Sequence, residues 1–202
     1  MKQSIAIWMA PVVAPVVALV VAGCDSTPTA PRPVVIMEPQ AGDHLWSFHE
    51  SGEALGSGGE LQIFLDHETH PEAKASFAKF TLGVGGALPV HRHDKTEEFA
   101  YILSGDGAAV TIGDEGEEIE VPISAGYFWY NPPGAWHAVR NQGTTPLALI
   151  FATVPNEEKG LLSFFRRISV EPGEEPIVLA PEDMERLGAE HDLILRPPPR
   201  GK

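Results

Sequence analysis

The chain is poor in cysteine and in basic residues. Cys24 is the one thiol among 202 residues, so no disulfide can form within a molecule and the fold must rest on its hydrophobic core. Lys and Arg number 14 against 28 Asp and Glu, which gives a formal net charge of −14. Nucleic-acid binding needs clustered cations that neutralise phosphates, and no stretch of this sequence supplies them. The absence of a Gly-x-Ser-x-Gly motif also disfavours an acyl-enzyme hydrolase.

The first 23 residues have the pattern of an export signal. A short cationic start precedes an almost wholly apolar run over residues 5–22. The run ends in Val21-Ala22-Gly23-Cys24, which resembles the lipobox of bacterial lipoproteins. The resemblance implies a signal peptide, 1–23, cleaved before Cys24, and a lipid on Cys24 that anchors the protein to a membrane of the bacterial cell envelope, facing the periplasm or the exterior. An uncleaved transmembrane helix is the alternative, but Pro11 and Pro15 count against it.

Residues 24–39 are expected to form a tether, and residues 40–155 a folded domain. The tether holds four prolines and cannot form a core, so it is predicted to be extended. From residue 40 the pattern changes to short apolar segments that alternate with Gly, Pro and acidic turns. The strands that this pattern predicts cover residues 61–65, 76–82, 99–103, 108–112, 127–130, 138–139 and 147–152. Short strands at this spacing, without helices between them, indicate an all-β antiparallel sandwich or barrel.

Residues 156–202 are predicted to be a C-terminal extension with short helices. Asn156 is expected to cap a helix whose first turn holds two glutamates. The apolar positions of this helix follow the i, i+3, i+4, i+7 rule and are Leu161, Phe164, Phe165 and Ile168. A second helix is expected over residues 181–187, with Gly188 just past its end. We expect both helices to cover the barrel rather than to form a separate interaction module, and residues 197–202 to be a disordered end.

Two histidines separated by one residue, His91 and His93, indicate a metal site. Side chains two apart on a strand point to the same face, about 6–7 Å apart along the backbone. Their imidazoles can therefore converge on one ion at about 2.0–2.1 Å. Glu98 follows across a turn and can supply an oxygen ligand, and His137 follows a tight Pro-Gly turn much later in the chain. Imidazoles with one carboxylate suit a divalent transition metal and leave coordination positions open.

These residues are part of a longer pattern that resembles the two motifs of the cupin superfamily. The first motif is Gly, five residues, His-x-His, three or four residues, Glu, six residues and Gly. Its positions are matched by Gly85, His91, His93, Glu98 and Gly105. The second motif is Gly, five residues, Pro-x-Gly, two residues, His, three residues and Asn. Its positions are matched by Gly126, Pro132, Gly134, His137 and Asn141.

The resemblance covers about residues 60–155 and implies a double-stranded β-helix, or jelly-roll barrel, with the metal inside. The implied ligands of one divalent ion (Fe, Mn, Zn, Cu or Ni) are His91, His93, Glu98 and His137. Glu97 is a rival to Glu98 because a three-residue gap also fits the motif, but Glu98 alone leaves six residues before Gly105. The other motif residues, Gly85, Gly105, Gly126, Pro132, Gly134 and Asn141, are expected to be structural. Glycine serves positive φ or close backbone approach, and Asn serves hydrogen bonds at a turn.

A cupin site does not by itself define a reaction, because one scaffold hosts unrelated functions. The sequence is similar to single-domain, quercetin-dioxygenase-like cupins in Arg92 and in residues 164–167, which implies a metal-dependent dioxygenase acting on a small oxygenated organic substrate. Two alternatives stay open: a non-catalytic module that captures a small ligand at the cell envelope, and a metal-assisted sugar isomerase or epimerase. No Lys or Tyr stands out as a separate acid or base, so any chemistry is expected to be metal-centred.

Two groups of aromatic residues lead to further expectations. Phe128, Tyr130 and Trp136 flank the second motif and are candidates to line the cavity, with ordinary core packing as the alternative for each. On the predicted strand over residues 99–103, alternation turns Phe99, Tyr101 and Leu103 away from the face that holds Glu98. Small cupins commonly pair through an outer sheet face, so the resemblance implies a homodimer.

Overall fold

The computed structural model describes residues 34–47 and 58–197. The chain divides at residues 36 and 37, and the fold given below is that of the part from residue 37 onward. The predicted signal peptide, Cys24 and most of the predicted tether lie outside the described residues. Among the residues that are described, no helix has the length and apolar character that crossing a membrane requires.

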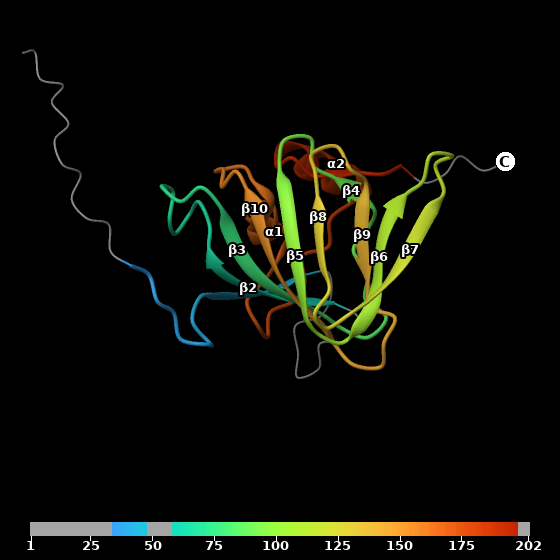
Figure 1. Ribbon diagram of the computed structural model, residues 1–202. Coiled ribbons are helices and arrows are strands. Elements are labelled where there is room, and N and C mark those ends of the chain that lie inside the picture. Colours follow the sequence, from blue (N-terminus) through green and yellow to red (C-terminus); the bar gives the residue numbers. More distant parts are fainter. Residues whose placement is uncertain (1–33, 48–57, 198–202) are drawn as a thin grey trace, which may run out of the picture. The chain divides into compact units, whose positions relative to one another are not determined.

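Residues 37–202 form two antiparallel β-sheets (Figure 1). The order of the six-stranded sheet is β1 (Asp43–Ser47), β2 (Gly59–Leu65), β3 (Ser76–Leu82), β10 (Leu147–Val154), β5 (Glu97–Ser104) and β8 (Phe128–Asn131). The order of the five-stranded sheet is β11 (Ile194–Leu195), β4 (His91–Arg92), β9 (His137–Arg140), β6 (Asp106–Ile112) and β7 (Glu118–Ser124). Neighbouring strands are often distant in the sequence, since β10 pairs with both β3 and β5. The arrangement is a double-stranded β-helix, and the all-β fold predicted from the sequence is confirmed.

Alternation along the strands sends one set of side chains into the core. In β5, Ala100 and Ile102 are buried, whereas Tyr101 and Leu103 between and after them are exposed. The largest fully buried apolar side chains are Phe80, Phe164, Leu61, Ile63, Leu82, Ile102, Leu147 and Val110. Burial of one such side chain contributes about 1.5–3 kcal/mol. This core supports the strands β4, β5 and β9, on which His91, Glu98 and His137 lie.

Several motif residues hold turns at the ends of strands. At Gly105, φ is +86° and an added Cβ would lie 2.5 Å from the carbonyl oxygen of Pro146, so no side chain fits there. Gly85, Gly126 and Gly134 also have positive φ. The Pro132 carbonyl accepts a hydrogen bond from the Ala135 amide at 3.1 Å, which closes the turn before His137.

The buried side chain of Asn141 joins three loops. Its Nδ2 has two N–H groups, which are shared among the carbonyl oxygens of Leu82, Gly83 and Thr145, each at 2.9 Å. Its Oδ1 accepts from the Gly143 amide at 3.0 Å. These contacts of one buried amide group fix the segment that follows β9, and with it the end of the strand that carries His137.

Two helices follow β10, and the first begins later than predicted. α1 (Leu161–Ile168) buries its apolar face against the barrel core, with Gly160 as its N-cap and no acidic residue in its first turn. The predicted cap at Asn156 is therefore wrong. Its side chain instead donates to the carbonyl oxygens of His70 and Ala73, at 3.0 and 3.3 Å, because the chain makes another turn before the helix starts.

The second helix runs further than predicted. α2 (Pro181–Glu190) begins at Pro181, as expected, but Gly188 lies inside it. A Cβ at Gly188 would lie 2.7 Å from the carbonyl oxygen of Leu193, so this glycine allows a close backbone approach instead of ending the helix. The chain then turns back and forms β11, a strand that the sequence did not predict, which pairs with β4 beside His91.

Candidate metal centre

Four buried side chains meet inside the barrel. His91 belongs to β4, Glu98 to β5 and His137 to β9, and His93 follows β4 directly. Pairing of β4 with β9 puts His91 opposite His137, with ring centroids 4.3 Å apart. One possible ligand atom from each residue can be chosen so that all four lie within 4.8 Å of one another. Ligand atoms about 2.1 Å from a shared ion are at most about 4.2 Å apart, so the cluster is close to the size of a coordination sphere.

The residue between the two histidines points away from the cluster. Arg92 donates from Nε to Asp94 Oδ1 at 2.8 Å, and its guanidinium lies 4.8 Å from the ring centre of Trp136. Both partners hold the cation outside while His91 and His93 turn inward. Alternation therefore gives the His-x-His pair one shared face, although the strand β4 itself ends at Arg92.

Each imidazole is oriented by a hydrogen bond from its Nδ1–H to a backbone carbonyl. His91 donates to Pro89 at 2.8 Å and His137 donates to Ala135 at 2.9 Å. His93 donates to Asp192 at 2.6 Å. Because a carbonyl accepts and never donates, the proton of each neutral ring is on Nδ1, and the Nε2 lone pair is left for a ligand.

Two of these ring nitrogens are buried without a hydrogen-bond partner. They are Nε2 of His93 and Nε2 of His137, which lie 3.4 and 3.5 Å from Glu98 Oε2. Buried polar atoms almost always have a hydrogen-bond partner, so two neighbouring nitrogens that lack one need an explanation. A metal ion between the two nitrogens and the carboxylate would satisfy all three groups at once.

The electrostatics of the cluster favour a cation. Burial opposes ionisation of Glu98, but His137 and His93 outweigh it and hold the pKa of this carboxyl well below its usual range. Burial also opposes protonation of His93, but Glu98 and the Asp192 carbonyl outweigh it and raise the pKa of this imidazole. Burial together with the neighbouring His137 and His93 lowers the pKa of His91 to about 3, so His91 stays neutral as a metal ligand must.

The structure distinguishes between the two candidate carboxylates. Glu98 is buried in the cluster, and Asn131 donates from Nδ2 to its Oε1 at 3.5 Å. Glu97 lies on the other face of β5, where partial burial and the Glu97 carboxylate raise the pKa of Tyr130. Neighbours on a strand point to opposite faces, so only one of the two can reach the histidines.

Asp192 supports the cluster from the C-terminal extension, and no pattern in the sequence predicted it. Its carboxylate accepts from the amides of Asp94, Lys95 and Thr96 at 2.9, 3.0 and 2.9 Å, and from Thr96 Oγ1 at 2.8 Å. This is the turn that separates His93 from Glu98, and the carbonyl of the same Asp192 orients His93. Asp192 has φ of 59°, a conformation that Asp tolerates better than most residues.

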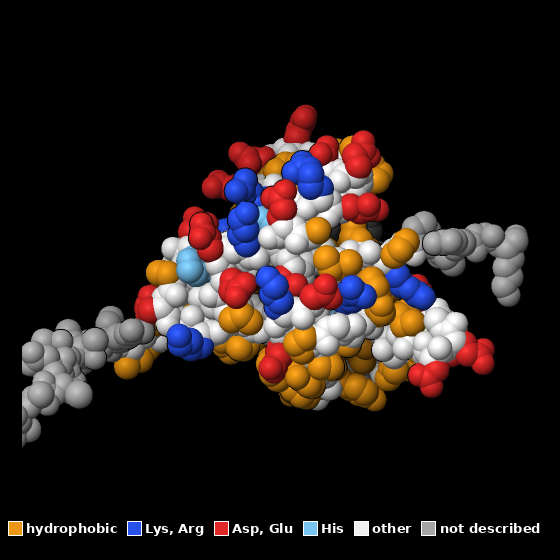
Figure 2. All heavy atoms as spheres, turned by 90° about the horizontal axis from the view of Figure 1, so that it is seen from above, with side chains coloured by type: hydrophobic (Ala, Val, Ile, Leu, Met, Phe, Trp, Pro, Cys, Tyr) orange, Lys and Arg blue, Asp and Glu red, His pale blue; other side chains and the backbone are white. Residues whose placement is uncertain are grey.

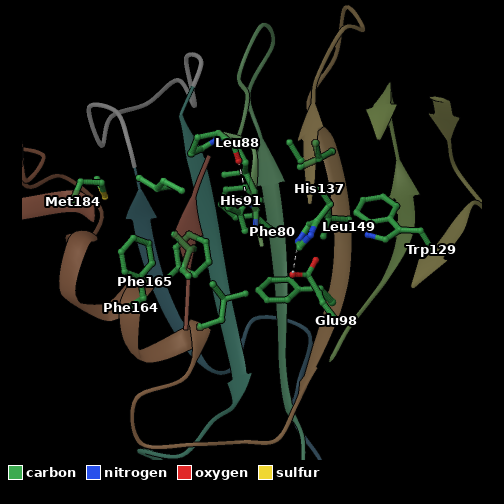
Figure 3. A pocket seen from close by; sticks show the side chains of 17 residues that line it. Phe80, Leu88, His91, Glu98, Trp129, His137, Leu149, Phe164, Phe165 and Met184 are labelled. Atoms are coloured by element: carbon green, nitrogen blue, oxygen red, sulfur yellow. Dashed lines mark hydrogen bonds and ion pairs between the residues drawn. The ribbon is translucent and has the colours of Figure 1, made fainter. Parts of the chain in front are cut away.

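A cavity of about 170 Å³ adjoins the cluster. His91, Glu98 and His137 form part of its wall, and Trp129 lies at the same end (Figure 3). Phe128 and Tyr130 were expected to line a cavity, but their side chains are 62% and 46% exposed on the outer face of β8. Trp129, which lies between them, lines the cavity instead, because alternation along the strand turns it inward. Trp136, the third candidate, is not among the lining residues, and its ring contacts the Arg92 guanidinium.

A double-stranded β-helix with a cluster of three His and one Glu inside it defines a class of small metal-site barrels. The chain belongs to the cupin family: residues 78–153 match the family model described as a cupin domain. An oxalate-binding protein of Thermotoga maritima is 31% identical over 97 residues, which cover 46% of this chain and 76% of that protein.

Two further proteins are similar to about half of the chain. An uncharacterised protein of Methanocaldococcus jannaschii is 30% identical over 98 residues, which cover 48% of this chain and 74% of the other. The crystal structure of a predicted oxalate decarboxylase from Thermotoga maritima is 30% identical, with a TM-score of 0.42, over 48% of this chain and 81% of that one. The family match ends at residue 153, so α1, α2 and β11 lie beyond it.

Proposed function

We propose that the barrel binds one divalent transition-metal ion through His91, His93, Glu98 and His137, and that the ion binds a small molecule by its oxygen atoms. The observation that carries this proposal is the convergence of oriented imidazoles, two of them with buried and unpaired Nε2 atoms, on one buried carboxylate. Nitrogen donors with one carboxylate suit Fe, Mn, Zn, Cu or Ni. The bound ion would supply Lewis-acid polarisation of an oxygen ligand.

The protein's own residues would orient the ligands and exclude water. Among the described residues that line the cavity, His91, Glu98 and His137 are the ones that titrate, and all three belong to the cluster. A sugar isomerase or epimerase needs a separate acid or base to move a proton at the substrate, and this cavity presents none. The absence of such a group favours ligand binding at the metal, in keeping with a relative named as oxalate-binding. Oxidation of the bound molecule by dioxygen is the second candidate, because it is metal-centred, and uptake of oxygen in the presence of a substrate would distinguish it.

Elemental analysis of the purified protein tests the proposal. We expect about one transition-metal ion per chain in the wild type. His137→Ala and Glu98→Ala should lower the metal content steeply, since loss of even a group that supports a ligand costs about 10–100-fold in affinity. Glu97→Ala is the matched control and should retain the metal, because this side chain lies on the opposite face of β5. Full occupancy in both ligand variants, or a wild type that never binds metal, would overturn the proposal.

We also propose, from the sequence, that the protein is exported and held at the cell envelope by a lipid on Cys24. A metal acquired outside the cytoplasm would then be selected by the site itself and by what that compartment supplies. Among divalent ions the usual order of affinity favours Cu and Zn over Fe and Mn unless the geometry of the site overrides it.

A further inference from the structure

The cavity beside the cluster has polar side chains of the cluster at one end and apolar side chains at the other. Figure 3 shows Glu98, His137 and Trp129 at one end, and Phe164, Phe165 and Met184 at the other. Apart from the three members of the cluster, every side chain that lines it is apolar or aromatic. Any polar atom of a ligand that does not reach the cluster would therefore face carbon and lose its hydrogen bonds to water.

The nearby arginine side chains bind other groups and do not line the cavity. Arg92 lies against Trp136 and Asp94, and Arg166 pairs with Asp66 and Asp43. Arg140 pairs with Glu118 and Glu120, and Arg196 donates to the carbonyl of Gly116. Within the described part of the chain, no Lys or Arg side chain belongs to the lining. A second carboxylate at the far end of a ligand would thus be buried without a counter-charge, which is strongly unfavourable.

The volume of the cavity limits the apolar part of the ligand. An apolar cavity of about 150 Å³ in another protein stays dry and binds benzene. The space here, about 170 Å³, accordingly fits one six-membered ring or a chain of similar size beside the metal-binding atoms.

The apolar end is built by the C-terminal extension. Leu161, Phe164 and Phe165 come from α1, Met184 comes from α2, and Leu195 comes from β11. All of these residues lie beyond the match to the family model, which ends at residue 153. The chain therefore adds its own hydrocarbon wall to a cluster that lies within the family match.

We infer that the ligand of this site is a molecule with one oxygen-donor end and an apolar body of about one ring, and that the C-terminal extension selects it against small or doubly charged acids. The inference rests on the proposed metal site, because the oxygen-donor end is held by the metal. It assigns to this chain a different class of ligand from the small dianion named for its relative.

Calorimetric titration of the Zn²⁺-loaded full chain with three hydroxamates tests the inference, because the metal-binding group is the same in each. Benzohydroxamate should bind about 10–100-fold more tightly than acetohydroxamate, since its ring is buried against the apolar wall. The 4-carboxy derivative of benzohydroxamate should lose most or all of that gain, because its charge reaches the apolar end. Equal affinities for the three compounds would overturn the inference while leaving the metal site intact.

A substitution at the far wall gives a second, independent arm. Met184→Lys puts a cation at the apolar end in a side chain of similar length, and Met184 is partly buried, so the ammonium can reach solvent when no ligand is present. We expect this variant to prefer the 4-carboxy compound over benzohydroxamate, and Met184→Leu to keep the wild-type order. An unchanged order in Met184→Lys would overturn the placement of the ligand against α2. A wild type that binds zinc but none of the hydroxamates, or binds no zinc, would remove the proposed function and this inference with it.

Discussion

At the scale of single residues, Asp66 shows how a buried charge ties the extension to the barrel. Arg166 of α1 donates from Nε to Asp66 Oδ2 and from Nη2 to Asp43 Oδ2, each at 2.6 Å. Thr69 donates from its amide and its hydroxyl to Asp66 Oδ1 at 3.1 and 2.9 Å. Burial opposes ionisation of Asp66, but these hydrogen bonds outweigh it and lower the pKa of the carboxyl.

This shift predicts a specific loss of stability in acid. A lowered pKa in the folded state stabilises the protein above the usual value of 3.8, and the stabilisation is lost as the pH falls through the folded-state pKa. Asp66→Asn should lower the free energy of unfolding at neutral pH by about 2–4 kcal/mol, because it leaves Arg166 with one buried partner fewer. Between about pH 5 and pH 2 the stability of the variant should then fall less than that of the wild type.

Urea unfolding at several pH values measures the effect. Glu185→Gln on the exposed side of α2 is the control and should follow the wild-type curve. Parallel curves for the wild type and Asp66→Asn would show that Asp66 has the same pKa in the folded and unfolded states.

The four cluster residues could be predicted from the sequence because their spacing translates directly into direction. His91 and His93 share a face and Glu98 is turned inward while Glu97 is turned outward, all through the two-residue period of a strand. The expectation for β8 did not use this rule, because Phe128 and Tyr130 were chosen for their place beside the second motif. Phe128 and Tyr130 follow one face of that strand, and it is the outer one.

At the scale of elements, the parts that escaped prediction depend on contacts between distant segments. β11 has two residues and exists because it pairs with β4. β7 contains Pro122, and proline disfavours a strand because it has no N–H to donate to a neighbouring strand. It is tolerated here because β7 is at the edge of its sheet. Asp192 carries no local signal at all, since its partners lie in the turn 94–96.

Removal of the Asp192 carboxylate should destabilise the turn that joins β4 to β5, because three amides of this turn lose their hydrogen-bond acceptor. Asp192→Asn and Asp192→Gly both keep a residue type that tolerates positive φ, so their shared effect reports on the carboxylate. We expect each to lower metal affinity by about 10–100-fold, as for other groups that orient ligands, without unfolding the barrel.

Competition with a chelator of known affinity measures this change. Asp183→Asn on α2, whose carboxylate pairs with Arg186, is the matched control and should bind metal as the wild type does. If both Asp192 variants also bind metal with wild-type affinity, Asp192 supports the loop but not the site.

At the scale of the whole molecule, the outer face of the larger sheet exposes apolar side chains. Figure 2 shows hydrophobic side chains gathered on one side of the surface. In the paired strands β5 and β8, Tyr101 lies opposite Phe128, and Phe99 stacks on Tyr130 with ring centroids 5.0 Å apart. Tyr101 and Leu103 are 44% and 46% exposed. A patch of this kind is typical of an interface between protein molecules.

We expect this face to pair two copies of the chain. Light scattering at micromolar concentration should give twice the mass of the chain, and Tyr101→Glu with Leu103→Lys should shift the mass to that of a monomer, because two like patches would then bury charges. Val84→Lys changes an apolar side chain of comparable exposure outside β5 and β8 and should leave the mass unchanged. A wild type that is monomeric under these conditions would contradict the expectation.

The predicted lipid anchor concerns residues outside the described part of the chain, and it stays a prediction. Wild-type protein should partition with membranes through acyl chains on Cys24, and Cys24→Ser should remain an unlipidated precursor. Intact-mass measurement of the mature protein decides the question. A chain that begins at another residue and carries an unmodified Cys24 would exclude the anchor.

The hydrogen bond between His93 and the Asp192 carbonyl spans 99 residues of chain. During synthesis, a ribosome makes all four cluster residues long before it makes the residue that orients one of them and fixes the turn beside it. In an incomplete chain the turn between His93 and Glu98 would therefore lack its support, and at the proposed site tight metal binding would begin when the last strand joins the sheet. If the proposed site binds metal, retention of that metal would report that the chain has been made and folded as far as β11.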